Sequence, residues 1–121
     1  MSKPAPHHKI NYIEFTTNSI ERSKQFYSTV FGWTFKDWGP DYIDCSAESS
    51  GIAIGIAKGT PSEMPLKSAP LAVLYSANLK ATEEAIIAAG GVIVVPTFEF
   101  PGGRRFHFSD GAGNLMGVWS E

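Results

Sequence analysis

The chain contains an internal repeat, and this repeat limits its fold more than any other feature. An alternating strand, a capped helix and short glycine-punctuated strands occur near residues 10–38 and again near residues 71–98. Ile20 aligns with Leu79 and Gly32 with Gly91, a constant offset of 59 positions. Each unit has an apolar sheet face that it cannot bury alone, so we expect the two units to share one core.

The first unit begins with a strand over residues 10–16, where polar and apolar side chains alternate. Asn18 or Ser19 then caps a helix, and Gly32 ends it in the left-handed conformation. Three further strands are expected, at residues 33–38, 42–47 and 51–58. In the last strand one face carries only the small residues Ala53, Gly55 and Ala57, which leaves room for a ligand or for another backbone.

The second unit repeats this order. Asn78 caps a helix that follows a strand over residues 71–76, and Gly90-Gly91 stops this helix. The remaining strands are expected at residues 92–95, 104–109 and 115–119. We therefore predict one domain over residues 1–121, with modules at 9–58 and 71–121 joined by a proline-containing linker at 59–70.

Composition excludes several classes of function. A net charge of −2 gives no general attraction for nucleic acid. The first residues lack the apolar core of a signal peptide, and no apolar run is long enough for a bilayer, so we expect a cytoplasmic protein without membrane contact. Cys45 is the only cysteine, which rules out an intrachain disulfide and a metal site built from cysteines.

Two motifs carry a resemblance to a known family. They are the helix that leads through Phe26-Tyr27 to Val-Phe-Gly-Trp at 30–33, and the turn Asp110-Gly-Ala-Gly-Asn114. With two βαβββ units in this length, the chain resembles the vicinal oxygen chelate superfamily, which contains glyoxalase I, bleomycin-resistance proteins, fosfomycin-resistance enzymes and extradiol dioxygenases. The resemblance implies an α+β fold in which two tandem βαβββ modules form a curved, partly open mixed β-sheet barrel with a central cleft.

Metal-dependent members of this superfamily bind their ion through a His on the first strand of each unit and a Glu near the end of the last strand. In the alignment these positions fall on Tyr12, Leu71 and Gly117. Leucine and glycine side chains offer no donor atom, and a neutral tyrosine is a poor ligand for a divalent ion. We therefore expect no family metal and no other cofactor.

The same resemblance predicts the residues of a ligand site. If the sheets curl as in the family, six side chains converge on one concave surface: Tyr12, Glu14, Tyr75, Arg105, His107 and Trp119. Glu14 is either a general base or the partner of Arg104 or Arg105 in an ion pair. His107 is either an acid–base or orienting group for a ligand, or a half-buried histidine that a backbone carbonyl satisfies.

These expectations combine into two functional hypotheses. The first is a protein of the bleomycin-resistance kind, which binds a small, partly apolar molecule in its cleft without a metal and forms a homodimer. The alternative is a lyase or isomerase of the glyoxalase type. It would use Glu14 as the catalytic base together with His107, either without metal or with a recruited divalent ion.

Overall fold

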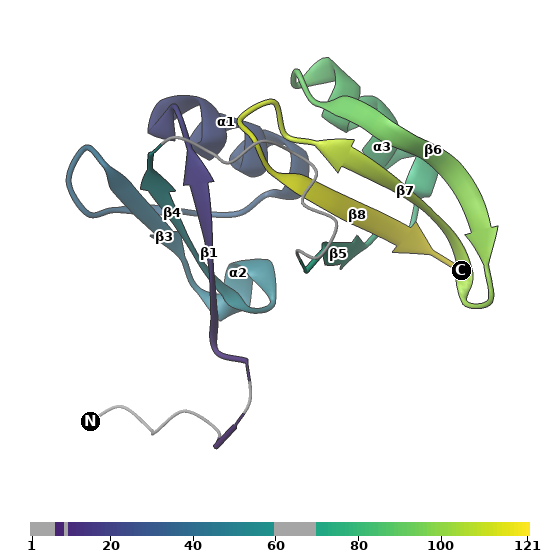
Figure 1. Ribbon diagram of the computed structural model, residues 1–121, viewed down its shortest axis with the longest axis horizontal. Coiled ribbons are helices and arrows are strands. Elements are labelled where there is room, and N and C mark those ends of the chain that lie inside the picture. Colours follow the sequence, from purple (N-terminus) through teal and green to yellow (C-terminus); the bar gives the residue numbers. More distant parts are fainter. Residues whose placement is uncertain (1–6, 9, 60–69) are drawn as a thin grey trace.

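The first module of the computed structural model holds one four-stranded sheet and one long helix (Figure 1). The structure describes residues 7–8, 10–59 and 70–121. The elements of this module are β1 (Tyr12–Thr17), α1 (Ile20–Phe31), β2 (Lys36–Asp37), β3 (Tyr42–Cys45), the helical turn α2 (Ala47–Ser50) and β4 (Ala53–Lys58). The strand order is β1-β4-β3-β2, with β1 parallel to β4 and the other pairs antiparallel, and we call this sheet A.

The second module has the same topology. Its elements are β5 (Ala72–Tyr75), α3 (Leu79–Ala88), β6 (Val92–Phe100), β7 (Gly103–Ser109) and β8 (Leu115–Ser120). The order β5-β8-β7-β6, with β5 parallel to β8, defines sheet B. The α+β class and the two tandem modules predicted from the sequence are therefore confirmed. The predicted linker falls largely on 60–69, outside the described residues.

Both long helices begin where the sequence places them. The Ser19 side chain accepts a hydrogen bond from the backbone N–H of Arg22 at 3.2 Å, and Asn78 caps α3 in the same way through Ala81. Gly32, at a φ of 72°, ends α1 in the left-handed conformation that glycine adopts without steric cost.

Three features of the strands differ from the sequence prediction. The strand expected at 33–38 is reduced to the two residues of β2. The helical turn α2 takes the place of the end of the strand expected at 42–47. Strand β6 runs on to Phe100, through Pro96, instead of ending at Val95. Its pairing with β7 shifts register on both sides of Val95, so the strand accommodates the proline, which lacks an N–H donor, at an irregularity near the sheet edge.

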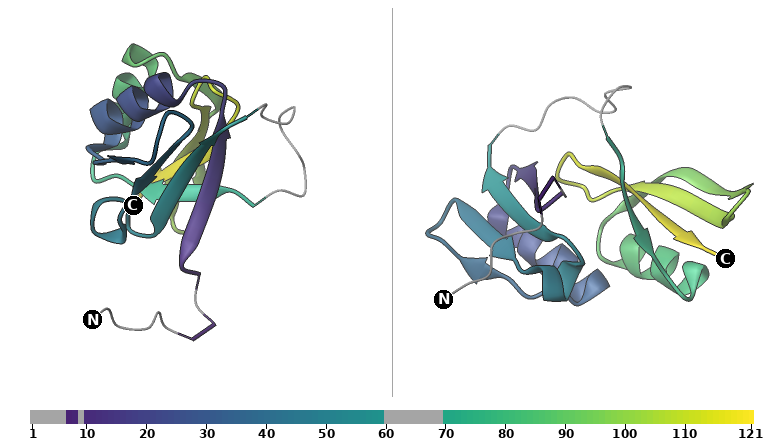
Figure 2. Two further views of the ribbon diagram at one scale, coloured as in Figure 1. Left: turned by 90° about the vertical axis from the view of Figure 1, so that its left-hand side faces the viewer. Right: turned by 90° about the horizontal axis from the view of Figure 1, so that it is seen from below.

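The two modules share one core, as expected from the repeat. Both α1 and α3 lie on the same side of the sheets (Figure 2). Phe26 and Phe31 of α1 reach across to Phe108 of sheet B, with ring centroids 6.2 and 6.1 Å apart. The fully buried side chains come from both modules, among them Tyr27, Ile43, Ile56, Ile86, Phe106, Phe108 and Val118. Burial across this junction holds the modules side by side.

The predicted tight turn at 110–114 links the second module to the first. The buried Asp110 carboxylate accepts hydrogen bonds from the Tyr27 hydroxyl at 2.6 Å, from the backbone N–H groups of Ala112 and Asn114, and from the Asn114 amide. The same Asn114 amide donates to the Thr16 carbonyl of β1 at 2.9 Å. A turn in sheet B thus contacts a helix and a strand of the first module.

Each sheet leaves one face uncovered by the helices, and we call these the open faces of sheets A and B. The two sheets form separate four-stranded units that do not close into a barrel within the chain (Figure 1). Across the described ranges, the longest apolar helical stretch falls short of what a bilayer span requires.

Candidate functional site

The open face of sheet A carries a chain of hydrogen bonds between three side chains. The hydroxyl groups of Tyr12 and Tyr42 are 2.6 Å apart, and the Tyr42 hydroxyl donates to Glu14 Oε1 at 2.9 Å. Burial, followed by the hydrogen bonds with Tyr12 and Glu14, raises the pKa of Tyr42 well above the usual value for a phenol. Tyr42 therefore stays protonated and acts as a donor to Glu14.

This hydrogen-bond chain depends on the absence of a side chain at Gly55. Gly55 lies opposite Glu14 in β1 and opposite Asp44 in β3. A Cβ atom at Gly55 would lie 2.0 Å from the Tyr42 hydroxyl and 2.2 Å from the Tyr12 hydroxyl. The row of small residues predicted from the sequence thus provides space for the two phenol groups.

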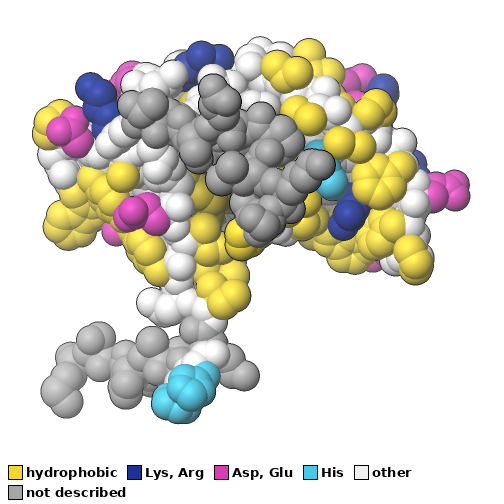
Figure 3. Space-filling view, viewed as in Figure 1, with side chains coloured by type: hydrophobic (Ala, Val, Ile, Leu, Met, Phe, Trp, Pro, Cys, Tyr) yellow, Lys and Arg dark blue, Asp and Glu magenta, His cyan; other side chains and the backbone are white. Residues whose placement is uncertain are grey.

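The open face of sheet B centres on Arg105. The guanidinium carbon lies 5.1 Å from the ring centre of Phe98 and 5.3 Å from that of Phe100, both on β6. The pairing of β7 places Phe98 on one side of Arg105 and Trp119 on the other. Figure 3 shows basic and histidine side chains among hydrophobic ones over this half of the molecule. The arginine is therefore a cation within an aromatic surface.

His107 lies two residues further along β7 on the same face. Its ring meets the Phe98 ring edge to face at 5.7 Å. Burial, and secondly the charge of Arg105, lower the pKa of His107 from its ordinary 6.5. The imidazole is accordingly neutral at about pH 7.

Two buried polar atoms on this face have no hydrogen-bond partner among the described residues, Nε of Arg105 and Nε2 of His107. The expectation that a backbone carbonyl satisfies His107 therefore fails for this nitrogen. Buried polar groups in proteins nearly always have partners, because an unpaired group loses its hydration without compensation. Two such atoms on adjacent open-face positions mark a place where a bound molecule could supply the missing partners.

Trp119 and Tyr75 form an aromatic wall beside Arg105. Their rings meet edge to face at 5.0 Å, and Trp119 also contacts Phe100 at 6.2 Å. The Tyr75 hydroxyl donates to the carboxylate of Glu121, and this hydrogen bond, ahead of burial, raises the pKa of Tyr75. The wall is therefore fixed at its outer edge by a polar contact.

The six residues predicted for the site fall into two groups. Tyr12 and Glu14 lie on sheet A, whereas Tyr75, Arg105, His107 and Trp119 lie on sheet B. Over the described ranges, no hydrogen bond, ion pair or ring contact joins the two groups. The prediction of an ion pair from Glu14 to Arg104 or Arg105 is also wrong within the described part of the chain. The Glu14 carboxylate accepts a hydrogen bond from the Tyr42 hydroxyl instead.

Sequence reasoning missed three members of these groups. The sequence pattern predicts Tyr42 only as a strand residue, although its position opposite the small-residue row signals a side chain lying across that row. Phe98 and Phe100 are absent from the predicted site because the predicted strand ends at Val95, whereas β6 continues to Phe100. The alternation in Phe-Glu-Phe at 98–100 was the signal that could have placed both rings on one face.

The residues at the family's metal positions do not fit a divalent ion. Gly117 lies opposite His107 in β7, and a Cβ there would lie 3.3 Å from the His107 ring and 3.5 Å from the Leu71 side chain. His107 is thus the one side chain with a metal-binding donor among these contacts, while Tyr12 lies on the other sheet. Within the described ranges, no three His, Cys, Asp or Glu side chains gather closely enough to hold an ion.

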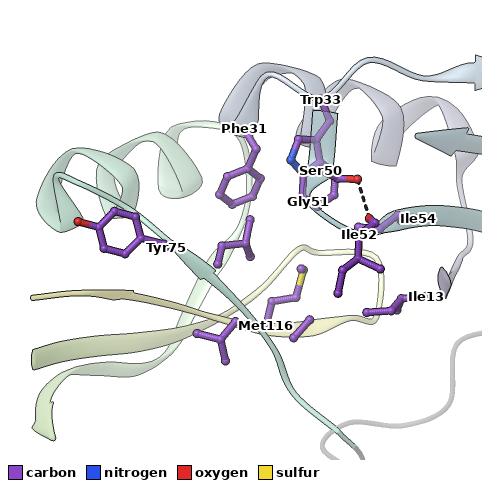
Figure 4. A pocket seen from close by; sticks show the side chains of 12 residues that line it. Ile13, Phe31, Trp33, Ser50, Gly51, Ile52, Ile54, Tyr75 and Met116 are labelled. Carbon is purple, nitrogen blue, oxygen red and sulfur yellow. Dashed lines mark hydrogen bonds between the residues drawn. The ribbon is translucent and has the colours of Figure 1, made fainter. Parts of the chain in front are cut away.

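A separate cavity of about 600 Å³ lies between the modules (Figure 4). Side chains from both modules line it, including Ile13, Phe31, Trp33, Ile54, Leu74 and Met116, and Tyr75 is the one predicted site residue among its lining. The hydroxyl of Ser50, at its edge, already donates to the Ile52 carbonyl at 2.8 Å. This cavity is mainly apolar, and neither Arg105 nor His107 belongs to its lining.

Comparisons with known proteins match this architecture. The family model described as Glyoxalase/Bleomycin resistance protein/Dioxygenase superfamily matches residues 9–118. CFP32 from Mycobacterium tuberculosis, which carries a provisional glyoxylase name, is 25% identical over 115 residues. That match covers 90% of this chain but only 44% of the relative, so the chain spans less than half of that protein.

Solved structures support the same fold. A glyoxalase-related enzyme from Fulvimarina pelagi is 17% identical with a TM-score of 0.76, and covers 94% of this chain and 88% of that one. The fosfomycin resistance protein FosX from Listeria monocytogenes is 16% identical with a TM-score of 0.77, over 94% and 91% of the two chains. By its fold and by the match over residues 9–118, the chain belongs to the glyoxalase/bleomycin resistance protein/dioxygenase superfamily.

Proposed function

We propose that this protein binds a small, partly apolar molecule on the open face of sheet B without the family metal. One observation carries the proposal: Arg105 Nε and His107 Nε2 are buried without partners in the described part of the chain, on a surface made mainly of aromatic rings. A ligand that combines an apolar body with a hydrogen-bond acceptor would satisfy both atoms and cover the rings. The donor-poor set Tyr12, Leu71 and Gly117 favours binding through these groups over binding through an ion.

We propose further that the protein is a homodimer in which a second copy covers the open faces. Large side chains stay uncovered there, with exposed fractions of 41% for Tyr12, 42% for Val73 and 52% for Tyr75. Apolar surface of this kind is typical of an interface or a ligand site. If sheet A of the second copy faces sheet B, the two groups of predicted residues meet across one cleft.

The cytoplasmic location predicted from the sequence also belongs to this proposal. It is supported by Cys45, which is a buried free thiol.

The binding proposal can be tested by adding a side chain at Gly117, which would press against His107, Val73 and Leu71. A mixed set of aromatic and alicyclic fragments is titrated into chelator-treated protein, and NMR follows the Gly117 amide and the Trp119 indole. We expect some fragments to shift both signals. We expect Gly117→Leu to lower the affinity of these fragments about tenfold, equivalent to about 1.4 kcal/mol. Ala77→Leu, at an exposed loop residue, is the control and should leave affinity unchanged. Binding that does not shift these signals would refute the assignment of the site.

The second candidate is a lyase or isomerase, and the chain Tyr12–Tyr42–Glu14 is the observation that favours it. A carboxylate with a phenol donor beside it could accept a proton and pass it on through the tyrosines. In an enzyme of this kind, with His107 as its partner, Glu14→Gln should abolish turnover while binding survives. In a protein that only binds, the same change should alter affinity alone.

A further inference from the structure

The positive charge on the open face of sheet B lacks a partner in the described part of the chain. Arginine stays protonated at any physiological pH. The two salt bridges found in the described ranges join Lys24 to Asp37 and Lys80 to Glu83. Glu99 lies across from Arg104, on the opposite face from Arg105. A half-buried cation with no counter-charge favours an anion as its ligand.

The position of the guanidinium group restricts the shape of that anion. Phe98 and Phe100 both lie against the Arg105 guanidinium group, so the group packs on rings of β6 rather than on a flexible loop. A guanidinium fork presents parallel N–H donors that match the two oxygens of a carboxylate. Holding the fork in advance reduces the entropy lost on binding.

His107 adds a hydrogen-bonding nitrogen without adding a second charge, and in the tautomer that carries the proton on Nε2 this nitrogen donates to a carboxylate. Its ring is neutral at about pH 7, because burial and the neighbouring arginine both oppose protonation. One full positive charge balances a monoanion such as a carboxylate. A phosphate dianion would carry more charge into the site than Arg105 can neutralise.

The rest of the surface fits the flat apolar body of a ligand. Gly117 is buried between His107, Val73 and Leu71, whose side chains would lie 3.3 to 3.5 Å from a Cβ atom there, so this part of the surface is closely packed. The Trp119 and Tyr75 rings form the wall next to it. Aromatic rings prefer offset or edge-to-face contacts with other rings, which this wall can provide.

We infer that the site takes an aromatic monocarboxylate, with the carboxylate on Arg105 and His107 and the ring against Trp119 and Tyr75. This inference rests on the proposed function and names the class of ligand for the same site. The attraction between the Arg105 guanidinium group and the ligand's carboxylate replaces the electrostatic contribution that a metal ion would make.

The test uses three probes with one ring system: naphthoate, naphthamide and naphthylmethylammonium. Each is titrated into the chelator-treated full chain, with affinity measured by calorimetry and location by the Gly117 and Trp119 NMR signals. We expect naphthoate to bind at least about tenfold tighter than naphthamide, and the ammonium compound to bind weakest.

Substitutions identify the group responsible. Arg105→Gln should remove the preference for naphthoate, whereas Arg104→Gln, with the same change of charge on the opposite face of β7, should keep it. Arg105→Lys retains the charge but loses the fork, and should give an intermediate preference. It also serves as the second variant if Arg105→Gln fails to fold.

Three outcomes would overturn the inference. Equal or tighter binding of naphthamide at Gly117 and Trp119 would refute the carboxylate class and leave the proposed function intact. A preference for naphthoate that appears only in Glu14→Gln would show that Glu14 of a second copy is the anion on Arg105. If neither these probes nor the wider fragment set shifts the two signals, the inference and the proposed function both fail.

Discussion

At the scale of single residues, His107 is the histidine whose protonation is coupled to its burial on the open face of sheet B. Burial and Arg105 lower its pKa in the folded chain below the ordinary 6.5, so the unfolded chain binds this proton more readily. The stabilisation that follows is fully present above about pH 6.5 and is lost as the pH falls through that value toward the folded-state pKa.

We therefore predict that His107→Gln flattens the acid side of the stability curve. Wild-type protein should lose free energy of unfolding between about pH 7 and about pH 5, and the variant should lose less over the same range. Denaturant titrations at several pH values measure this slope. His8→Gln removes an exposed histidine outside both sheets and is the matched control. Equal slopes for wild type and His107→Gln would contradict the account.

At the scale of elements, the turn between β7 and β8 connects the two modules. Tyr27 of α1 is fully buried, and burial, followed by the charge of Asp110 and the hydrogen bond to it, raises the pKa of its hydroxyl. The phenol therefore stays protonated and donates to a buried carboxylate, which is a stronger hydrogen bond than a neutral pair makes.

Tyr27→Phe should destabilise the protein by about 2 kcal/mol, because it leaves the Asp110 carboxylate without one of its donors. Chemical denaturation followed by tryptophan fluorescence gives this value. Tyr75→Phe removes a similar tyrosine–carboxylate bond from the surface and should leave the midpoint nearly unchanged. Equal effects of the two substitutions would show that the turn does not hold the modules together.

Most elements could be predicted from the sequence because their signals are local. Ser19, Asn78 and Gly32 fix the helix ends through caps, and alternation fixes the faces of β1, β7 and β8. The helical turn α2 and the extension of β6 beyond Pro96 could not be predicted in this way. Both depend on contacts with neighbouring elements, such as the hydrogen bond from the Thr34 N–H to Ser49 in α2 and the pairing of Phe98 with Arg105.

At the scale of the whole molecule, the position of the sheets decides which residues can meet. Strand parity correctly placed Arg105, His107 and Trp119 on one face of sheet B. The sequence could not tell whether Glu14 and Arg105 face each other within one chain, since this depends on how the modules pack. In the structure, α1 packs against both sheets and the two open faces remain separate.

A homodimer built on these faces predicts a specific effect of charge. Val73→Asp places a carboxylate on the open face of β5 and should shift the protein toward monomer in sedimentation equilibrium, because an interface disfavours an unpaired buried charge. Ile87→Asp changes a similarly exposed apolar residue on α3 and should leave the mass unchanged. A monomeric wild type at every concentration would refute the dimer.

The central claim is that the site binds its ligand through Arg105 and His107 and not through a metal ion. Metal content and bound naphthoate are therefore measured together on purified, ligand-saturated protein, before and after treatment with a chelator. We predict metal far below one ion per chain and ligand binding that the chelator leaves intact. Stoichiometric nickel, zinc or manganese, removed together with the ligand by the chelator, would contradict the account.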